Sequence, residues 1–145
     1  MTGHQITKPD EALKFMLAGK ATVTLKSAKS GEHLTYRIAK PKPNKAKPNG
    51  PTHFVKVRTG NDFAYLGFFG TEGKFIHGRN ADLPSDSQQS RAFAWTIAKL
   101  QANQLPEKLE VWHEGQCGRC GRALTDPSSI ASGIGPECAK KMECL

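Results

Sequence analysis

The clearest indication of the fold is the stretch ATVTLKS at residues 21–27, followed after a short turn by LTYRI at residues 34–38. In both stretches apolar and polar residues alternate, which is typical of a strand with one buried face. A serine and a glycine at positions 30 and 31 lie between the two stretches. This arrangement predicts a β-hairpin.

The same strand pattern returns in several later segments. They are Phe54–Thr59, Phe63–Phe69, a short piece at Lys74–Ile76, and Leu109–Trp112. The glycine-containing turns Gly60-Asn61-Asp62 and Gly70–Gly73 separate the first three of these segments. Strands joined by short turns favour antiparallel pairing, so we expect an antiparallel sheet of about five strands.

Two segments have helical periodicity, Pro9–Ala18 and Asp86–Ala102. Proline and acidic residues suit the first turn of the first helix. The spacing of Ser85 and Gln88 predicts a capping box at the start of the second. The sequence therefore predicts an α+β fold with two helices, plus a C-terminal zinc knuckle that is described below.

The positive charge is concentrated in one part of the chain. The 145 residues include 21 Lys and Arg and 13 Asp and Glu, for a net charge of +8. Residues 20–58 hold ten of these bases and a single acid, Glu32, so this segment alone carries +9. The cations that we assign to a nucleic-acid interface are Lys26, Lys29, Arg37, Lys40, Lys42, Lys45, Lys47, Lys56 and Arg58. A local basic excess favours a polyanionic partner, DNA or RNA, over the alternative of a merely solubilising surface.

Residues 40–51 (KPKPNKAKPNGP) contain four prolines and four lysines without apolar periodicity. Proline removes backbone donors and like charges repel, so we expect a loop between two strands. The strands near this loop also contain rings, and Phe63, Tyr65 and Phe69 would share one face of a regular strand. We expect these three rings to lie in the core. The alternative is that they are exposed and form, with Lys56 and Arg58, a platform for phosphates and stacked bases.

The strongest chemical motif is CGRCG at residues 117–121, with Cys138 further along the chain. A Cys-x-x-Cys pair followed by glycine, with a third cysteine, matches the ligand spacing of structural zinc sites. His113 precedes Cys117 by four residues and is our preferred fourth ligand, with Cys144 as the alternative. The sequence therefore predicts that Zn²⁺ binds Cys117, Cys120, Cys138 and one of these two residues.

The run CGRCGRALTDPSSIASGIGPEC, residues 117–138, resembles a short zinc-binding domain of unknown function found in phage and actinobacterial proteins. Some members of that family carry a histidine four residues before the first cysteine, as His113 stands here. The resemblance implies a zinc-knuckle module and a phage or mobile-element origin. It implies no activity, and it covers residues 113–138 only.

Motifs of several enzyme classes are missing from the sequence. It contains no Gly-x-x-x-x-Gly-Lys phosphate loop and no Gly-x-Ser-x-Gly elbow. The segment HEGQC at residues 113–117 has cysteine where a zincin helix requires histidine. Pro136-Glu137-Cys138 lacks the spacing of a zinc deaminase. We therefore expect no enzymatic activity.

These observations predict a basic α+β domain over residues 1–112 and a zinc-binding module over residues 113–145. The expected function is that of a small non-enzymatic, zinc-binding and nucleic-acid-binding protein. The alternative is a phage counter-defence inhibitor, similar to an anti-CRISPR, that contacts a host or defence nucleoprotein. No segment approaches the roughly 18 apolar residues that a membrane span needs, and no secretory leader is visible at the start. We therefore expect a cytoplasmic protein, in the host cytoplasm if phage-encoded, without membrane partners.

Overall fold

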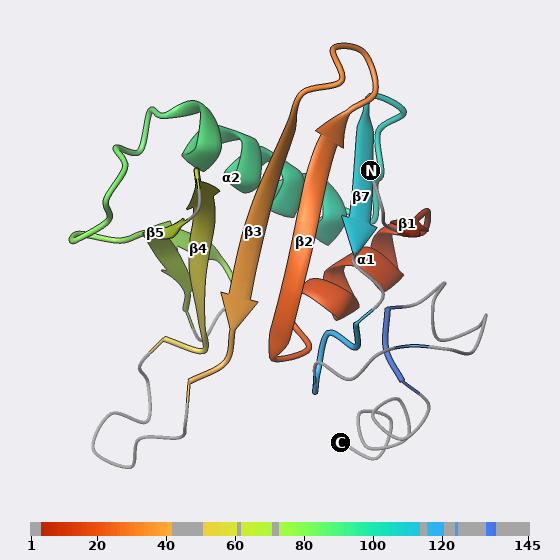
Figure 1. Cartoon of the computed structure of the whole chain (residues 1–145), viewed down its shortest axis with the longest axis horizontal. Coiled ribbons are helices and arrows are strands. Elements are labelled where there is room, and N and C mark those ends of the chain that lie inside the picture. The colour runs from red at the N-terminus through yellow and green to blue at the C-terminus, as the bar shows by residue number, and fades with distance from the viewer. Residues whose placement is uncertain are drawn as a thin grey trace.

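The computed structural model describes residues 4–41, 51–60, 62–70, 73–113, 116–120, 124 and 133–135. These residues form two helices and seven strands (Figure 1). In chain order the elements are β1 (His4–Ile6), α1 (Pro9–Met16), β2 (Lys20–Ser27), β3 (His33–Ala39), β4 (His53–Thr59), β5 (Asp62–Phe69), β6 (Phe75–His77), α2 (Gln88–Gln101) and β7 (Leu109–His113).

All seven strands belong to one antiparallel sheet with the order β1-β7-β2-β3-β4-β5-β6. Strands β2 to β6 follow each other in chain order as a meander. β7 instead inserts between β1 and β2, where His113 pairs with His4 on one side and with Val23 on the other. The residues that follow β7, 116–120, therefore lie next to the start of β2. We call them the cysteine segment.

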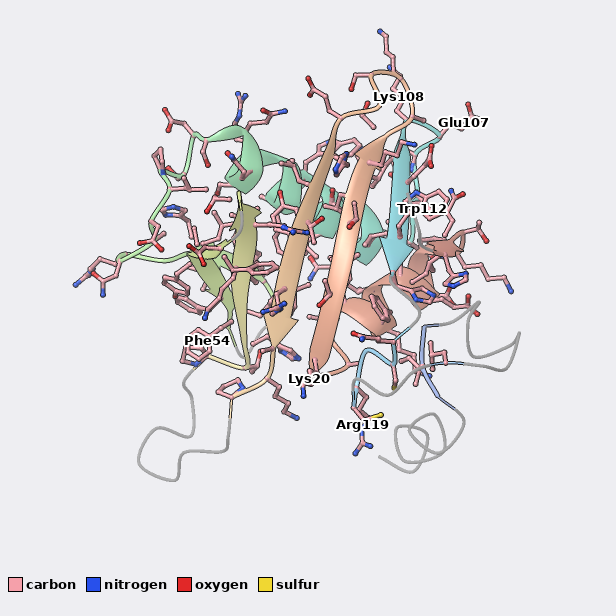
Figure 2. All side chains as sticks on the ribbon, in the orientation of Figure 1. Lys20, Phe54, Glu107, Lys108, Trp112 and Arg119 are labelled. Carbon is pink, nitrogen blue, oxygen red and sulfur yellow. The ribbon has the colours of Figure 1, made fainter. Side chains whose placement is uncertain are left out.

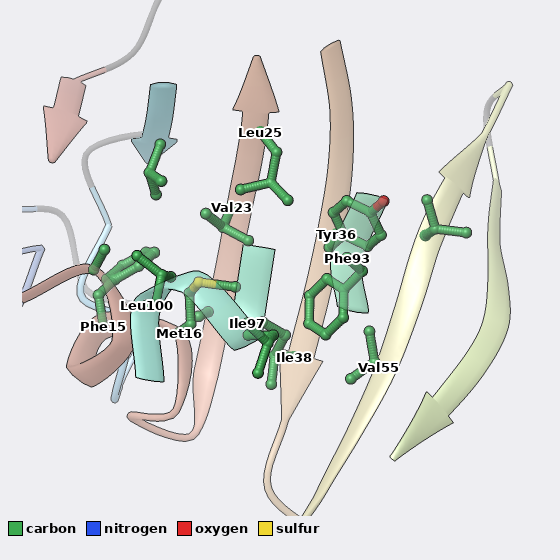
Figure 3. Packing of buried hydrophobic residues seen from close by; sticks show 14 of the residues in the cluster. Phe15, Met16, Val23, Leu25, Tyr36, Ile38, Val55, Phe93, Ile97 and Leu100 are labelled. Carbon is green, nitrogen blue, oxygen red and sulfur yellow. The ribbon is translucent and has the colours of Figure 1, made fainter. Parts of the chain in front are cut away.

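The core lies between one face of the sheet and both helices (Figure 3). Alternate strand residues such as Val23, Tyr36 and Ile38 are fully buried beneath α2, together with Phe93 of that helix. The rings of Tyr36 and Phe93 have centroids 4.8 Å apart. The Tyr36 hydroxyl also donates a hydrogen bond of 2.6 Å to the backbone carbonyl of Gln89, which fixes α2 against the sheet.

Helix α2 begins later than the sequence predicted. Its N-cap is Ser87, whose side chain accepts a hydrogen bond from the Ser90 N–H, so the assignment of Ser85 to the capping box was wrong. Ser87 N–H donates to Pro84 O, so Asp86 lies in a turn that precedes the helix and not in its first turn. Trp95 lies off the buried stripe and is 46% exposed. Neither described helix is long and apolar enough to cross a membrane.

The prediction of about five strands was also wrong, because the described sheet has seven. β1 and β6 have three residues each, and Ile6 is the single buried residue of β1. A three-residue segment is too short to show a period-two alternation. β6 nevertheless falls on the short piece predicted at Lys74–Ile76, whereas β1 was missed, because it becomes a strand only by pairing with β7.

Candidate functional site

Both described helices pack on one face of the sheet, and the opposite face is open in the described part of the chain (Figure 1). Directly paired residues in antiparallel strands point to the same side, so the register identifies the residues of this open face. From β2 to β5 and on β7 they are Lys20, Thr22, Thr24, Lys26, His33, Thr35, Arg37, Ala39, Phe54, Lys56, Arg58, Phe63, Tyr65, Phe68, Glu110 and Trp112.

A β-bulge decides which rings reach the open face. Val55 pairs with Gly67 and Lys56 pairs with Tyr65, so Leu66 is an extra residue in β5. A bulge reverses the alternation of the strand beyond it. Both Leu66 and Phe69 therefore lie in the core.

Before the bulge, Phe63 and Tyr65 point away from the core. Phe63 pairs with Arg58 and Tyr65 pairs with Lys56, and both rings are partly exposed. The expectation of a core position was therefore wrong for these two rings and correct for Phe69, which is 1% exposed. Glycine inside a strand is a known sign of a bulge, and Gly67 was the signal that could have predicted the reversal.

Three cations and three rings gather on adjacent strands of this face. We call this set the open-face patch, and it consists of Arg37, Phe54, Lys56, Arg58, Phe63 and Tyr65. The cations lie on β3 and β4, whereas two of the rings lie side by side along β5. The patch thus has a cationic side and an aromatic side on one surface.

The side chains of the patch contact each other across the strands. The guanidinium carbon of Arg37 lies 4.0 Å from the centroid of the Phe63 ring, above its face, in a cation–π arrangement. The rings of Phe54 and Tyr65 have centroids 6.2 Å apart. Arg58 Nε–H donates to Gly60 O at 3.2 Å, which orients its side chain along the surface.

Tyr65 contacts the segment that follows β6, both through its ring and through its backbone. A Cβ on Gly78 would lie 2.8 Å from the Tyr65 ring, so a glycine is needed where this ring crosses the backbone. Tyr65 N–H donates to Asp82 Oδ2 at 2.9 Å, and Asp82 N–H donates to Tyr65 O at 2.9 Å. Partial burial raises the pKa of the Tyr65 hydroxyl above its ordinary value.

The open face is electropositive. Among the described strand residues that point to it, Glu110 is the one acid, and it accepts a 3.0 Å hydrogen bond from Trp112 Nε1–H. Lys26 lies beside this pair, because it is in register with Glu110 on β2. The cationic surface therefore extends from β4 towards β2. Near β7, the negative charge of Glu110 partly offsets the positive charge of Lys26.

Of the other cations that we assign to the interface, two lie near opposite ends of the strands, and three lie outside the residues that the structure describes. Lys29 is exposed in the turn between β2 and β3. Lys40 is exposed after β3, and its N–H donates to Gly19 O at 2.9 Å. This is the end of the sheet at which Lys20 and Phe54 are found (Figure 2). The three other lysines assigned to the interface, Lys42, Lys45 and Lys47, lie outside the described residues.

The cysteine segment contacts the start of β2 and helix α1. Lys20 N–H donates to Gly118 O at 2.6 Å, and Gly118 N–H donates to Gly133 O at 2.8 Å. A Cβ on Gly118 would lie 2.6 Å from a ring carbon of Phe15, so the segment packs directly on α1. Cys117 and Ile134 form a second small buried cluster beside Ala18.

Backbone N–H groups lie within hydrogen-bond distance of the Cys117 sulfur. The backbone N–H groups of Arg119 and Gly135 lie 3.4 and 3.3 Å from Cys117 Sγ. Burial raises the pKa of this thiol, but hydrogen bonds from backbone N–H groups, including that of Cys120, and from the Cys120 side chain bring it down to about 7. Since a thiolate is the form that binds metal, this arrangement suits a ligand.

His113 is 1% exposed at the end of β7. Its ring centroid is 5.4 Å from those of both Phe15 and His4, so it packs beside the helix that also supports the cysteine segment. No group of three or more His, Cys, Asp or Glu side chains among the residues described is placed to hold a metal ion. Cys138 and Cys144 lie outside the described residues, and the ligand set therefore stays a prediction.

No curated protein and no solved structure matches the chain. A family of unknown function (DUF6011) matches residues 109–143. This match agrees with the predicted resemblance to a short domain of unknown function, and it leaves zinc binding untested. The segment formed by β7 and the cysteine region is therefore similar to this family.

Proposed function

We propose that this protein binds nucleic acid on the open face of its sheet and is not an enzyme. One observation carries the proposal: Arg37, Lys56 and Arg58 lie beside exposed rings on a single surface. Cations neutralise phosphates and release their counterions, while rings offer surfaces on which bases stack. The two kinds of side chain serve different parts of one ligand.

The rings support a ligand more strongly than the charges do. A cationic surface alone serves solubility, but exposed rings add no solubility and expose apolar area to water. Phe54 is 36% exposed in the patch, and Ile76 on the neighbouring β6 is 46% exposed. A partner that covers the patch removes this area from water.

We also propose that Cys117, Cys120 and Cys138 bind one zinc ion together with His113 or Cys144. The support is the chemistry of Cys117, whose sulfur accepts two backbone N–H groups and whose pKa is lowered to about 7. A zinc ion bound by four protein ligands cross-links the chain and leaves no position for a reacting water. Its role in this proposal is structural.

The test of nucleic-acid binding is a titration of labelled single- and double-stranded oligonucleotides at several salt concentrations, followed by fluorescence anisotropy. Three phosphate contacts predict a slope of log K against log salt of about −2 for a single strand. Binding that is absent at low salt, or that does not change with salt, would contradict the proposal. So would a protein partner from the host that remains bound after nuclease treatment and in high salt.

A further inference from the structure

We propose that the open-face patch selects single-stranded nucleic acid, with bases on the rings of β5 and phosphates over the cations of β3 and β4. This inference rests on the proposed function and adds to it the strandedness of the ligand and its orientation on the sheet. It follows from the spacing of the rings, the width of the sheet and the contact of Arg37 with Phe63.

The spacing of the rings requires an extended strand. Phe63 and Tyr65 are two residues apart on β5, so they stand about 6.8 Å apart along the strand. Nucleotides in a duplex rise by only about 3.4 Å each. Two neighbouring bases that stack on these two rings are therefore separated from each other, which is possible in a single strand and not in an intact duplex.

The width of the sheet also disfavours a duplex. Neighbouring strands lie about 4.8 Å apart, so seven strands span about 29 Å. The major groove of B-form DNA is about 12 Å wide and admits a helix or a two-stranded ribbon. The cations of the patch lie on β3 and β4, which have a paired strand on each side, whereas Phe63 and Tyr65 lie on the part of β5 that precedes its pairing with β6. The surface that carries the cations is therefore too wide to enter this groove together with the rings.

Arg37 strengthens the aromatic side of the patch. Its guanidinium lies over the face of Phe63 at 4.0 Å, having crossed β4 to reach it. A guanidinium is planar, and bases stack on it as they do on rings. The pair therefore presents one stacking surface that also carries a positive charge, whereas Tyr65 with Phe54 presents a second.

The two sides of the patch set the orientation of the strand. Lys56 pairs directly with Tyr65, and Arg58 pairs directly with Phe63, so each ring has a cation on the neighbouring strand. The phosphates then lie about 5–10 Å from the rings, over β4 and β3. The nucleic acid runs along the direction of β5, with about one nucleotide for each ring.

The experiment compares a mixed-sequence 12-nucleotide strand, as DNA and as RNA, with the duplex formed by the same strand and its complement. We expect the single strand to bind at least tenfold more tightly than its duplex at the same salt concentration. Equal affinities, or tighter binding of the duplex, would overturn the inference while leaving the proposed function intact. Absence of binding to every nucleic acid would overturn both.

Ring variants test stacking separately from charge. Phe63→Leu and Tyr65→Leu should each weaken single-strand binding by about 5- to 100-fold, without changing the salt slope or the affinity for duplex. Tyr65→Phe keeps the ring and should keep the affinity. The matched control is Trp95→Leu, because Trp95 is an exposed ring on α2, outside the open face, and its loss should leave binding unchanged.

Arg37 provides a second, independent readout. Arg37→Lys keeps the charge but loses the planar stacking surface, so single-strand affinity should fall while the salt slope stays the same. Thermal unfolding of each variant reports whether the sheet is intact. If the ring and Arg37→Lys variants are folded and bind as tightly as the original protein, stacking on this patch is refuted, although phosphate binding stands.

Discussion

Replacing Gly118 by alanine tests how the cysteine segment is attached to the rest of the protein. An added Cβ would lie 2.6 Å from Phe15 Cδ1 and 2.8 Å from the Phe15 carbonyl oxygen. Ordinary contacts of a Cβ begin at 3.4 Å, so the segment or α1 must move by about 1 Å. One of the two obstacles is backbone, which cannot turn aside as a side chain can.

The expected cost follows from overpacking. Such insertions destabilise proteins by about 1–3 kcal/mol. For a chain of this size each kcal/mol lowers the thermal midpoint by about 2–4 °C, so Gly118→Ala should lower it by about 2–12 °C. The hydrogen bonds of the Gly118 backbone to Lys20 and Gly133 remain chemically possible in the variant.

Differential scanning calorimetry measures the midpoint, and Gly135→Ala is the matched control. A Cβ at Gly135 would find Leu124 at 3.8 Å and Cys117 Sγ at 4.0 Å, which are ordinary contacts. This control should shift the midpoint by about 2 °C or less. Equal midpoints for Gly118→Ala and the original protein would refute the packing of the segment on Phe15.

Three further predictions concern charge, metal and pH. Replacing Lys56 and Arg58 by alanine should lower the salt slope of single-strand binding by about 1.4 in an anisotropy titration, whereas Lys99→Ala on α2 should leave it unchanged. Cys117→Ser together with Cys120→Ser should abolish zinc in elemental analysis, and one zinc per chain in the double variant would contradict the assigned ligands. In metal-free protein the pKa of Cys117, about 7, lies below the roughly 8.5 of an unfolded cysteine. Its thiolate therefore stabilises the fold above about pH 8.5, and this contribution is lost as pH falls through 7. Urea unfolding between pH 6 and 9 should show it, and Cys117→Ser should remove it.

The long strands could be predicted from the sequence because each of them has a buried and an exposed side. The alternation in β2 and β3 indicated the hairpin, and the described register pairs Val23 with Tyr36 as a hairpin requires. The place of β7 could not be predicted in this way. Its insertion between β1 and β2 depends on pairing between distant segments, which local periodicity does not encode.

The candidate site was predictable in its charges but not in its rings. Lys56 and Arg58 were assigned from composition and spacing alone, and both lie on the open face. Phe63 and Tyr65 were misplaced because a regular alternation was carried through β5 as far as Phe69. The extra residue Leu66 breaks that alternation, and a bulge is set by tertiary pairing as much as by sequence.

In the cysteine segment too, the local features could be predicted from the sequence and the long-range contacts could not. The local spacing of Cys117 and Cys120 indicated a metal ligand pair, and the N–H of Arg119, between them, lies at Cys117 Sγ. The second donor, Gly135 N–H, comes from a distant part of the chain. The contact between Gly118 and Phe15 joins residues that are far apart in the chain, and no local sequence pattern predicts it.

NMR can map which face of the sheet contacts the nucleic acid. ¹⁵N-labelled protein is titrated with a 12-nucleotide single strand, and shifts of backbone amides are followed along the sheet and along α2. We predict the largest shifts at Arg37, Lys56 and Tyr65, with the exposed residues of α2 unaffected. Shifts that are confined to α2, or spread evenly over the molecule, would contradict binding on the open face.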